Sequence, residues 1–285
     1  MAVNNSLVAR KNQKAGLTAY LTQDAVKDQI NKVVGGKNGQ RFMSAIISAV
    51  NTNPELQECT NPSILSGALL GESLNLSPSP QLGQYYLVPF NDKNKGKVAQ
   101  FQLGYKGYIQ LAIRSGQYKK LNVLAIKEGE LIRFDPLNEE IEVRLIEDEE
   151  AREQAATIGY YAMFEYVNGF KKAMYWSRKK METHALKYSK GYAAKKGFTF
   201  WEKDFDAMAY KTMLRQLISK WGIMSIDMMT AMDSDMAVIN EDGTKNYVET
   251  EESVIDAEVT EQQEEKTEDS GNRTPTGASA ALFGK

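Results

Sequence analysis

Cations and aromatic residues alternate in three stretches of this 285-residue chain. The first stretch is FQLGYKGYIQLAIRSGQYKK (101–120), whose apolar period predicts a helix that ends at Arg114. Lys106 and Arg114 lie two turns apart on its narrow polar stripe, and Lys119 and Lys120 follow. On this stretch alone, the solvated face of an ordinary amphipathic helix is the better interpretation. A surface for a long, anionic and partly apolar ligand is the alternative.

The same stretch contains two glycines, Gly104 and Gly107, which are poor helix residues. Tyr105 lies next to Lys106, and Gly107 follows it. Glycine costs about 1 kcal/mol relative to alanine within a helix, so its presence needs a reason. Without a Cβ atom, Gly107 would allow the backbone of a ligand or of a neighbouring subunit to approach closely.

Two further cationic stretches lie in the second half of the chain. Residues 176–192 include a predicted helix from Ser177 to Lys190, with Ser177 as its N-terminal cap. Residues 203–222 predict a long helix that has an apolar face beside a row of polar side chains. The residues singled out in these two stretches are Arg178, Lys187, Tyr188, Lys190, Lys211 and Arg215.

Cations beside aromatic rings match the chemistry of an unpaired polynucleotide strand. Lysine and arginine neutralise phosphates and release counterions, which gives affinity that does not depend on base sequence. Aromatic faces stack on unpaired bases, at about 1–3 kcal/mol per base. Each stretch alone is also typical of buried tyrosines and solvated lysines. The three stretches together favour a groove for a single strand.

The charge of the chain is segregated along the sequence. The net charge is −2, but residues 241–285 hold 12 acids and 4 bases, which leaves +6 on the first 240 residues. A mildly basic body with an acidic tail is common in proteins that bind nucleic acids, and such a tail also aids solubility. Beyond about Val238 the composition is typical of disorder.

Several kinds of site are excluded by what the sequence lacks. No G-x-x-x-x-G-K-[ST] loop is present, so ATP hydrolysis is not expected. No G-x-S-x-G motif is present either. The single histidine, His184, and the single cysteine, Cys59, exclude a histidine-rich metal site, a zinc ribbon and an internal disulfide. No run of about 18 apolar residues predicts a membrane helix.

A magnesium-dependent nuclease stays open as an alternative, because carboxylates can bind Mg²⁺. The carboxylates that are closest in sequence are Glu202, Asp204, Asp206, Asp227, Asp233 and Asp235. Three of them, Glu202, Asp204 and Asp206, also suit the first turn of a helix, where carboxylates interact favourably with the helix dipole. We therefore predict no catalytic residue and no metal site.

The elements around these stretches indicate an α+β fold with a meander of antiparallel strands. Further helices are predicted over 22–34, 42–50, 62–74 and 225–233, and Asn61 is the expected cap of the third. Strands are predicted in GQYYLVPF, KVAQFQL, KLNVLAI, ELIRF, IEVRLI, TIGYYAMFEYV and FKKAMYW. Asn168-Gly169 predicts a type I′ turn between the last two strands. Gly222 is the expected C-terminal cap of the helix over 203–222.

Four segments resemble those of a known family. NPSILSGALLGESLNLSPSPQLGQYYLVPF, LGYKGYIQLAIRSGQY, SRKKMETHALKYSK and WEKDFDAMAYKTMLRQLISKWG are similar, in this order, to segments of the RecT family of phage and prophage single-strand annealing proteins. The similarity extends from about Gln40 to Met232. It implies a curved antiparallel sheet packed by helices, related to the core of the eukaryotic annealing proteins.

The resemblance also implies an activity and partners. Members of the family bind single-stranded DNA and anneal complementary strands without ATP. They assemble into rings or helical filaments and work with a partner 5′–3′ exonuclease. No bond is made or broken, so the protein would not be an enzyme and would need no cofactor, although Mg²⁺ could influence DNA binding. It would act in the cytoplasm of a bacterial host. A passive protein that coats single strands is the main alternative.

We divide the chain accordingly into a flexible arm (1–39), a core for DNA binding and oligomerisation (40–237) and a disordered acidic tail (238–285). The tail could aid solubility, compete with DNA or recruit a partner such as the host single-strand-binding protein. The predicted phosphate contacts are Lys106, Arg114, Lys119, Lys120, Arg178, Lys187, Lys190, Lys211 and Arg215. Stacking or close approach to DNA is predicted for Tyr105, Gly107 and Tyr188.

Overall fold

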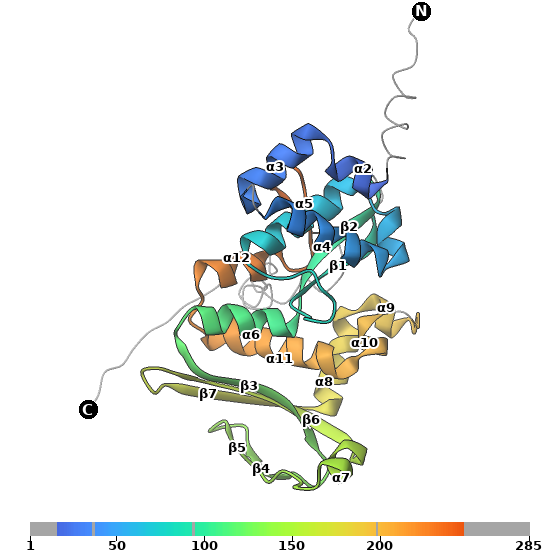
Figure 1. Ribbon diagram of the computed structural model, residues 1–285. Coiled ribbons are helices and arrows are strands. Elements are labelled where there is room, and N and C mark those ends of the chain that lie inside the picture. The colour runs from blue at the N-terminus through green and yellow to red at the C-terminus, as the bar shows by residue number, and fades with distance from the viewer. Residues whose placement is uncertain (1–15, 36–37, 93–94, 198, 248–285) are drawn as a thin grey trace, which may run out of the picture. The chain divides into compact units, whose positions relative to one another are not determined.

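The computed structural model describes residues 16–35, 38–92, 95–197 and 199–247. Figure 1 shows helices packed on antiparallel strands, which confirms the predicted α+β class. The strands are divided among three sheets. The described residues belong to one unit of the chain, residues 1–253.

The first sheet contains both early and late segments of the chain. Its order is β1 (Tyr85–Asp92), β2 (Gly96–Leu103), β8 (Ala237–Ile239) and β9 (Lys245–Tyr247), and all neighbours are antiparallel. All of β8 is buried. The ordered core therefore runs past the predicted boundary at residue 237, because a strand of three residues leaves little trace in the composition. The remainder of the predicted tail, 248–285, lies outside the described residues.

Because β9 belongs to the first sheet, the stability of a truncated chain should depend on whether the chain ends before or after β9. The hydroxyl of Tyr247 donates a hydrogen bond to the backbone carbonyl of Asp233, and the Lys245 ammonium pairs with the Asp233 carboxylate. A chain ending at Asn240 loses these contacts and the β8–β9 ladder, whereas a chain ending at Tyr247 keeps them. We expect the shorter chain to be less stable by roughly 1–3 kcal/mol in urea denaturation. Equal midpoints for the two chains would show that β9 contributes nothing.

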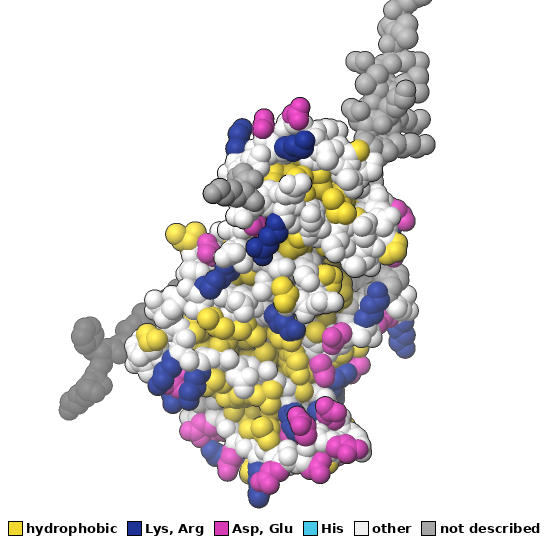
Figure 2. Space-filling model, viewed as in Figure 1, with side chains coloured by type: hydrophobic (Ala, Val, Ile, Leu, Met, Phe, Trp, Pro, Cys, Tyr) yellow, Lys and Arg dark blue, Asp and Glu magenta, His cyan; other side chains and the backbone are white. Residues whose placement is uncertain are grey.

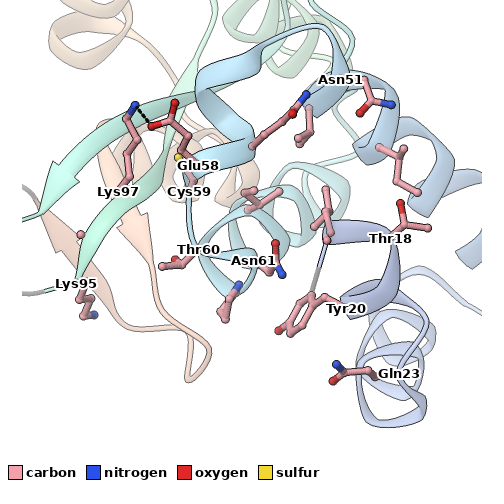
Figure 3. A pocket seen from close by; sticks show the side chains of 18 residues that line it. Thr18, Tyr20, Gln23, Asn51, Glu58, Cys59, Thr60, Asn61, Lys95 and Lys97 are labelled. Carbon is pink, nitrogen blue, oxygen red and sulfur yellow. Dashed lines mark hydrogen bonds and ion pairs between the residues drawn. The ribbon is translucent and has the colours of Figure 1, made fainter. Parts of the chain in front are cut away.

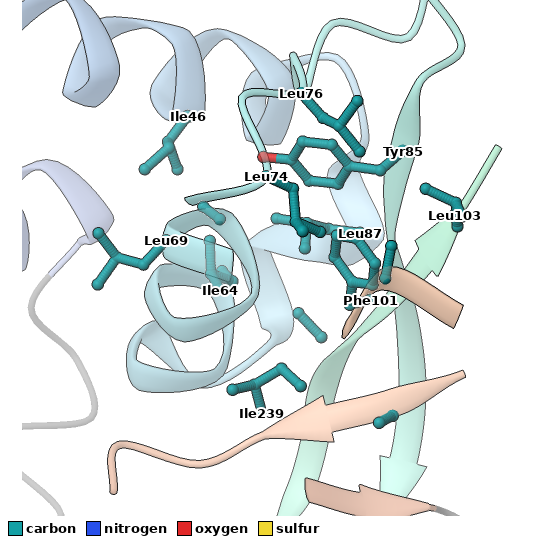
Figure 4. Close-up of a cluster of buried hydrophobic side chains, with 14 of the residues drawn as sticks. Ile46, Ile64, Leu69, Leu74, Leu76, Tyr85, Leu87, Phe101, Leu103 and Ile239 are labelled. Carbon is teal, nitrogen blue, oxygen red and sulfur yellow. The ribbon is translucent and has the colours of Figure 1, made fainter. Parts of the chain in front are cut away.

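Helices from the N-terminal part of the chain form a core with the first sheet. They are α2 (Leu17–Leu21), α3 (Asp24–Val34), α4 (Gly39–Asn51), the 3₁₀ helix η1 (Pro54–Glu58) and α5 (Asn61–Ser73). Ile46 of α4, Ile64 of α5 and Phe101 of β2 lie in this core (Figure 4). Leu21 and Ile30 are also buried in it.

The described part of the predicted arm, residues 16–35 and 38–39, is therefore part of the core. Residues 1–15 lie outside the described chain. The residue at the N-cap of α5 is Thr60 instead of the predicted Asn61, which is the first helical residue. Proline at the second position of α5 fits the first turn, where its missing N–H has no helical partner.

The second sheet holds the other large cluster of buried side chains. Its order is β3 (Tyr118–Lys127), β6 (Thr157–Tyr166) and β7 (Lys171–Ser177). Two helices, α6 (Tyr105–Arg114) and α11 (Phe205–Trp221), lie along this sheet (Figure 1). Tyr160 and Phe164 of β6 are fully buried there, as is Leu217 of α11.

The turn between β6 and β7 differs from the predicted type. Only Gly169 has a positive φ, at 88°, whereas a type I′ turn needs positive φ at Asn168 as well. The Gly169 N–H donates to the Tyr166 carbonyl at 3.0 Å, and the Tyr166 N–H donates to the Phe170 carbonyl at 2.9 Å. This is the three-residue hairpin connection in which a glycine forms a bulge. This connection needs one residue with positive φ, which is Gly169, whereas the predicted type I′ turn would need two.

A small excursion joins β3 to β6. It consists of β4 (Leu131–Asp135), β5 (Glu140–Val143) and α7 (Glu149–Gln154). Its anchor is Glu130, whose buried carboxylate accepts hydrogen bonds from the Arg152 side chain and from the N–H groups of Lys127 and Ile146. These bonds satisfy a charge that would otherwise be costly to bury.

The remaining helices start at polar caps that the sequence shows clearly. They are α8 (Arg178–Tyr188), α9 (Lys190–Ala193), α10 (Phe200–Lys203) and α12 (Ile226–Ser234). Ser177 caps α8 as predicted, by accepting a hydrogen bond from the Lys180 N–H. Asp204 caps α11, which therefore begins at Phe205. Gly222 is the C-terminal cap of α11, as predicted, and its backbone there is extended (φ −80°).

Candidate nucleic-acid interface

A groove of about 460 Å³ lies between the first sheet and the α8–α10 segment. A smaller cavity of about 240 Å³ shares Gln102, Phe200 and Lys203 with it, so the two are continuous. We call them together the DNA groove. Its residues from the α8–α10 segment include Tyr188, Lys190, Lys196, Phe200 and Lys203, and those from β1 and β2 include Tyr86, Phe90, Gln100 and Gln102.

Several cations and one ring of the DNA groove are exposed at the surface. The side chains of Lys190, Lys196 and Lys203 are exposed, and Phe200 is 40% exposed. Phe200 faces Tyr86 of β1, with ring centroids 5.8 Å apart. Three ammonium groups beside exposed rings can hold the phosphates of a strand and stack its bases.

Two caps hold the groove residues in place. The Ser189 hydroxyl accepts the Tyr192 N–H and so starts α9 next to Lys190. Thr199 and Glu202 form a reciprocal capping box at the start of α10. The Thr199 hydroxyl accepts the Glu202 N–H and the Glu202 carboxylate accepts the Thr199 N–H, which fixes the backbone that carries Phe200 and Lys203. Trp201, between them, is buried and anchors α10.

Two of the twelve predicted residues, Tyr188 and Lys190, line the main groove, and Tyr105 and the largely buried Lys211 line the smaller cavity. Lys106 is exposed, and its ammonium lies 5.9 Å from the centroid of the Tyr105 ring. Lys187 is also exposed, 5.0 Å from the Tyr188 ring. These six residues thus lie in or beside one groove.

Gly107 makes a close backbone contact within the chain. A Cβ atom at this position would lie 2.2 Å from the backbone carbonyl oxygen of Gln84. The close approach that needs glycine is therefore made by the loop before β1 of the same chain. Gly107 is buried and does not meet a ligand.

Arg114 also has a structural partner. Its guanidinium donates to the carbonyl oxygens of Leu74 at 2.7 Å and Asn75 at 3.2 Å, next to the C-terminal end of α5. Carbonyls at the end of a helix lack helical partners, and a cation there satisfies them. Arg114 thus joins α6 to α5, and the predicted phosphate contact is not supported by its geometry.

Lys211 and Arg215 both pair with a buried carboxylate, that of Asp235. Lys211 is 7% exposed and its ammonium lies 3.0 Å from the carboxylate of Asp235, which is itself buried. Arg215 pairs with the other oxygen of Asp235 at 2.9 Å. The same carboxylate accepts the Leu103 N–H at 2.8 Å. The two cations hold α11, β2 and the segment before β8 together, and a phosphate cannot replace Asp235 without opening the core.

Lys119 and Lys120 lie away from the DNA groove, at the start of β3. Their ammonium groups are 2.8 Å and 3.7 Å from the carboxylate of Glu165, which Lys171 also approaches at 3.4 Å. The hydrogen bond from Lys119 contributes most to lowering the pKa of Glu165 below its usual value. Neither Lys119 nor Lys120 lines the DNA groove.

Arg178 and His184 lie on α8 with partners of their own. The Arg178 guanidinium stacks 3.8 Å from the Phe205 centroid and donates to the Tyr160 hydroxyl at 2.8 Å. His184 packs against the Tyr188 ring at 4.5 Å. Burial, followed by the nearby cations Lys187, Arg215 and Lys180, lowers the pKa of His184 to about 4. The imidazole is therefore neutral at pH 7 and adds no charge to the groove.

Sequence reasoning missed Tyr86, Gln100, Gln102, Lys196, Phe200 and Lys203. A signal for three of them was present, because KKGFTFWEK (195–203) alternates cations with aromatic residues as the three chosen stretches do. The residues from β1 and β2 lack such a signal. Their place in the groove depends on how the first sheet packs against α10, about 100 residues later in the chain.

A larger cavity of about 750 Å³ lies among the N-terminal helices and is shown in Figure 3. Its cations are Lys95 and Lys97, and the Lys97 ammonium is 2.8 Å from the carboxylate of Glu58. Burial raises the pKa of the adjacent Cys59 thiol to about 11, so this thiol is protonated at pH 7. With one lysine already paired and a thiol that stays protonated, this cavity suits an anionic strand less well than the DNA groove does.

The carboxylates considered for Mg²⁺ have separate partners. Glu202 belongs to the capping box of α10, Asp206 accepts the Tyr160 hydroxyl, and Asp235 holds Lys211 and Arg215. Among the residues that the structure describes, no three acidic, histidine or cysteine side chains converge as a metal site. The described helices include none that is long and apolar enough to span a membrane.

Comparison with known proteins agrees with the earlier resemblance. The model of the RecT family matches residues 40–269. The chain is 40% identical over 261 residues to the uncharacterized protein YqaK of Bacillus subtilis, covering 90% of this chain and 84% of that protein. It is 29% identical over 238 residues to the protein RecT of Escherichia coli, covering 81% of this chain and 84% of that protein. The chain belongs to the RecT family, whose members anneal single-stranded DNA in recombination.

Proposed function

We propose that this protein binds single-stranded DNA in the DNA groove and anneals it to a complementary strand without ATP. The observation that carries the proposal is the convergence of three exposed lysines, Lys190, Lys196 and Lys203, with the exposed Phe200 ring in one groove. Membership of the RecT family supports annealing as the use of this groove.

The chemistry of the groove suits annealing better than base recognition. Lysines neutralise the backbone of one strand, which lowers its repulsion for a second strand. Stacking on Phe200 or Tyr188 tolerates any base, since every base has a flat face. Sequence information then comes from base pairing between the strands. No bond is broken in this process, so neither a cofactor nor a nucleotide is required.

The remaining parts of the proposal concern partners. The protein acts as a homo-oligomer on DNA and receives single strands from a 5′–3′ exonuclease. It works in the cytoplasm of a bacterial cell, where the host single-strand-binding protein covers the same substrate. Mg²⁺ influences binding by screening phosphates, and it takes no part in chemistry.

Annealing of two labelled complementary oligonucleotides tests the proposal, with the products run on native and denaturing gels. Without ATP, and with EDTA or with Mg²⁺, we expect duplex formation to be accelerated while both strands keep their full length. Tight binding without acceleration would favour the passive coating protein. Shortened strands that appear only with Mg²⁺ would favour the nuclease.

A further inference from the structure

The excursion between β3 and β6 carries a large share of the acidic residues. Residues 128–155, which we call the acidic lobe, contain 11 acids and 3 bases. The other residues from 16 to 247 have a net charge of +10. In Figure 2 the acidic side chains gather at the lower end of the molecule, where Figure 1 places α7 and the β4–β5 hairpin. The fold therefore gathers these acidic residues at one end, although they lie between basic segments in the sequence.

Most of the charge of the acidic lobe is not neutralised by the residues that the structure describes. Three of its acids form ion pairs: Glu130 with Arg152, Glu140 with Arg133, and Glu139 with Lys172. Its other eight acids form no ion pair with the described residues. They include Glu149, Glu150 and Glu153, which are all exposed on α7.

The acidic lobe also exposes large apolar side chains. Leu137, in the turn between β4 and β5, is 88% exposed, and Ile132 is 57% exposed. Leu145, which precedes α7, is 48% exposed. Apolar side chains beside unneutralised carboxylates would suit a partner surface that is both basic and apolar.

A surface of that kind lies at the turn between β6 and β7. Lys119, Lys120 and Lys171 surround the single carboxylate of Glu165, so this group has a net charge of +2. Val167 and Phe170 in the turn are 65% and 45% exposed. We call these lysines and the turn the basic tip.

The basic tip extends to the end of α11. The Tyr166 hydroxyl donates to the carbonyl oxygen of Trp221 and accepts the N–H of Ile223. Trp221 and Ile223 are 42% and 45% exposed, so they enlarge the apolar part of the surface. Lys172 covers the Trp221 ring at 3.9 Å, and its ammonium is paired with Glu139 of the acidic lobe.

The basic tip and α7 cannot reach each other within one molecule. They lie at opposite ends of β3 and β6, each ten residues long. A strand of this length spans about 33 Å. Only the β4–β5 turn bends back far enough for Glu139 to meet Lys172. That contact within the chain shows that the two kinds of surface are compatible.

We propose that the basic tip of one copy of this chain docks on the acidic lobe of the next copy. The inference rests on the proposed function, in which the protein acts as an oligomer. Two different patches that complement each other form a head-to-tail contact, which builds a ring or an open helical chain according to the rotation between copies. No residue that lines the DNA groove belongs to either patch. A strand could therefore run from copy to copy while both contacts stay in place.

Two charge-reversed proteins test the docking. The tip variant carries Val167→Glu and Lys171→Glu, and the lobe variant carries Glu149→Lys, Glu150→Lys and Glu153→Lys. Each retains one intact patch. Mass photometry of the parent, with and without single-stranded DNA, should show assemblies larger than dimers. Each variant alone should be monomeric, and an equal mixture should assemble again, starting with heterodimers, because the intact tip of the lobe variant meets the intact lobe of the tip variant.

Matched reversals on α3 serve as controls. Asp28→Lys and Lys32→Glu change exposed charges outside both patches, and these proteins should assemble as the parent does. Assembly of either patch variant at the parental level would overturn the proposal. A mixture without heterodimers, or a parent that stays monomeric with DNA, would overturn it as well.

The outcome can be separated from that of the proposed function. Fluorescence anisotropy with a short labelled oligonucleotide reports binding to single copies, and the monomeric patch variants should retain it. Loss of binding by variants of the DNA groove with normal assembly would confirm that the two surfaces are independent. Normal assembly together with normal binding by the groove variants would reject the groove and leave the docking proposal intact.

Discussion

Replacing Lys190, Lys196 and Lys203 with alanine should weaken binding to single-stranded DNA on the order of 100-fold at 0.1 M salt. Each neutralised phosphate contributes about 0.7 to the slope of log affinity against log salt concentration for single strands. Loss of three contacts should therefore reduce the magnitude of this slope by about 2. Anisotropy titrations with a labelled oligothymidine at several salt concentrations measure both quantities.

A matched triple variant provides the control for charge alone. Lys27, Lys32 and Arg41 lie on α3 and α4, outside the DNA groove, and their replacement by alanine removes the same three charges. We expect a much smaller change in affinity and slope. Equal losses for the two triple variants would mean that net charge, not the groove, determines binding.

The ring of Phe200 separates stacking from charge in the same groove. Phe200→Ala should cost about 1–3 kcal/mol of binding free energy per stacked base. Its salt slope should stay at the parental value, since no phosphate contact is removed. A reduced slope for this variant would indicate that the loss of the ring displaced α10 and its lysine, Lys203.

Asp235→Asn should destabilise the folded protein by about 3–5 kcal/mol, the usual cost of removing one partner from a buried ion pair. The carboxylate of Asp235 is buried and holds Lys211, Arg215 and the Leu103 N–H. Asparagine keeps an acceptor for Leu103 but leaves the Lys211 ammonium buried without an opposite charge. Urea denaturation followed by circular dichroism measures the change.

A second substitution tests the reason for that loss. In the Asp235→Asn background, Lys211→Met removes the uncompensated buried ammonium while keeping a side chain of similar length, so it should recover part of the lost stability. Asp28→Asn, an exposed carboxylate on α3, should change the free energy of unfolding by less than about 0.5 kcal/mol. If Lys211→Met destabilises the Asp235→Asn protein further, Lys211 is not the source of the cost.

The pairing with Asp235 leads to different expectations for Lys211 and Arg215 than a role in DNA binding would. Had Lys211 and Arg215 been phosphate contacts, their loss would reduce the salt slope of DNA binding in protein that is still folded. The structure instead predicts that their loss mainly lowers stability. Measuring both quantities on Arg215→Ala distinguishes the two roles.

The sequence by itself determined the local elements. The period of its apolar residues predicted α6, α8, α11, β1, β2 and the strands of the second sheet, because side chains that face a core must recur with the repeat of the element. Ser177 was predicted as a cap because a serine hydroxyl before a helix can accept a hydrogen bond from the backbone N–H three residues later. Four long segments between Gln40 and Met232, which occur in the same order as in the RecT family, also indicated the family.

The tertiary structure alone decided which cations face solvent. Lys211 and Arg215 show the same four-residue spacing as a solvated stripe, yet Asp235, 24 and 20 residues later, folds onto them. Arg114 stays exposed, but its guanidinium is hydrogen-bonded to the end of α5. Periodicity separates a polar face from an apolar face, but it does not show which segment will cover the polar one. The DNA groove and the basic tip likewise arise where distant segments meet, and that meeting depends on packing instead of local pattern.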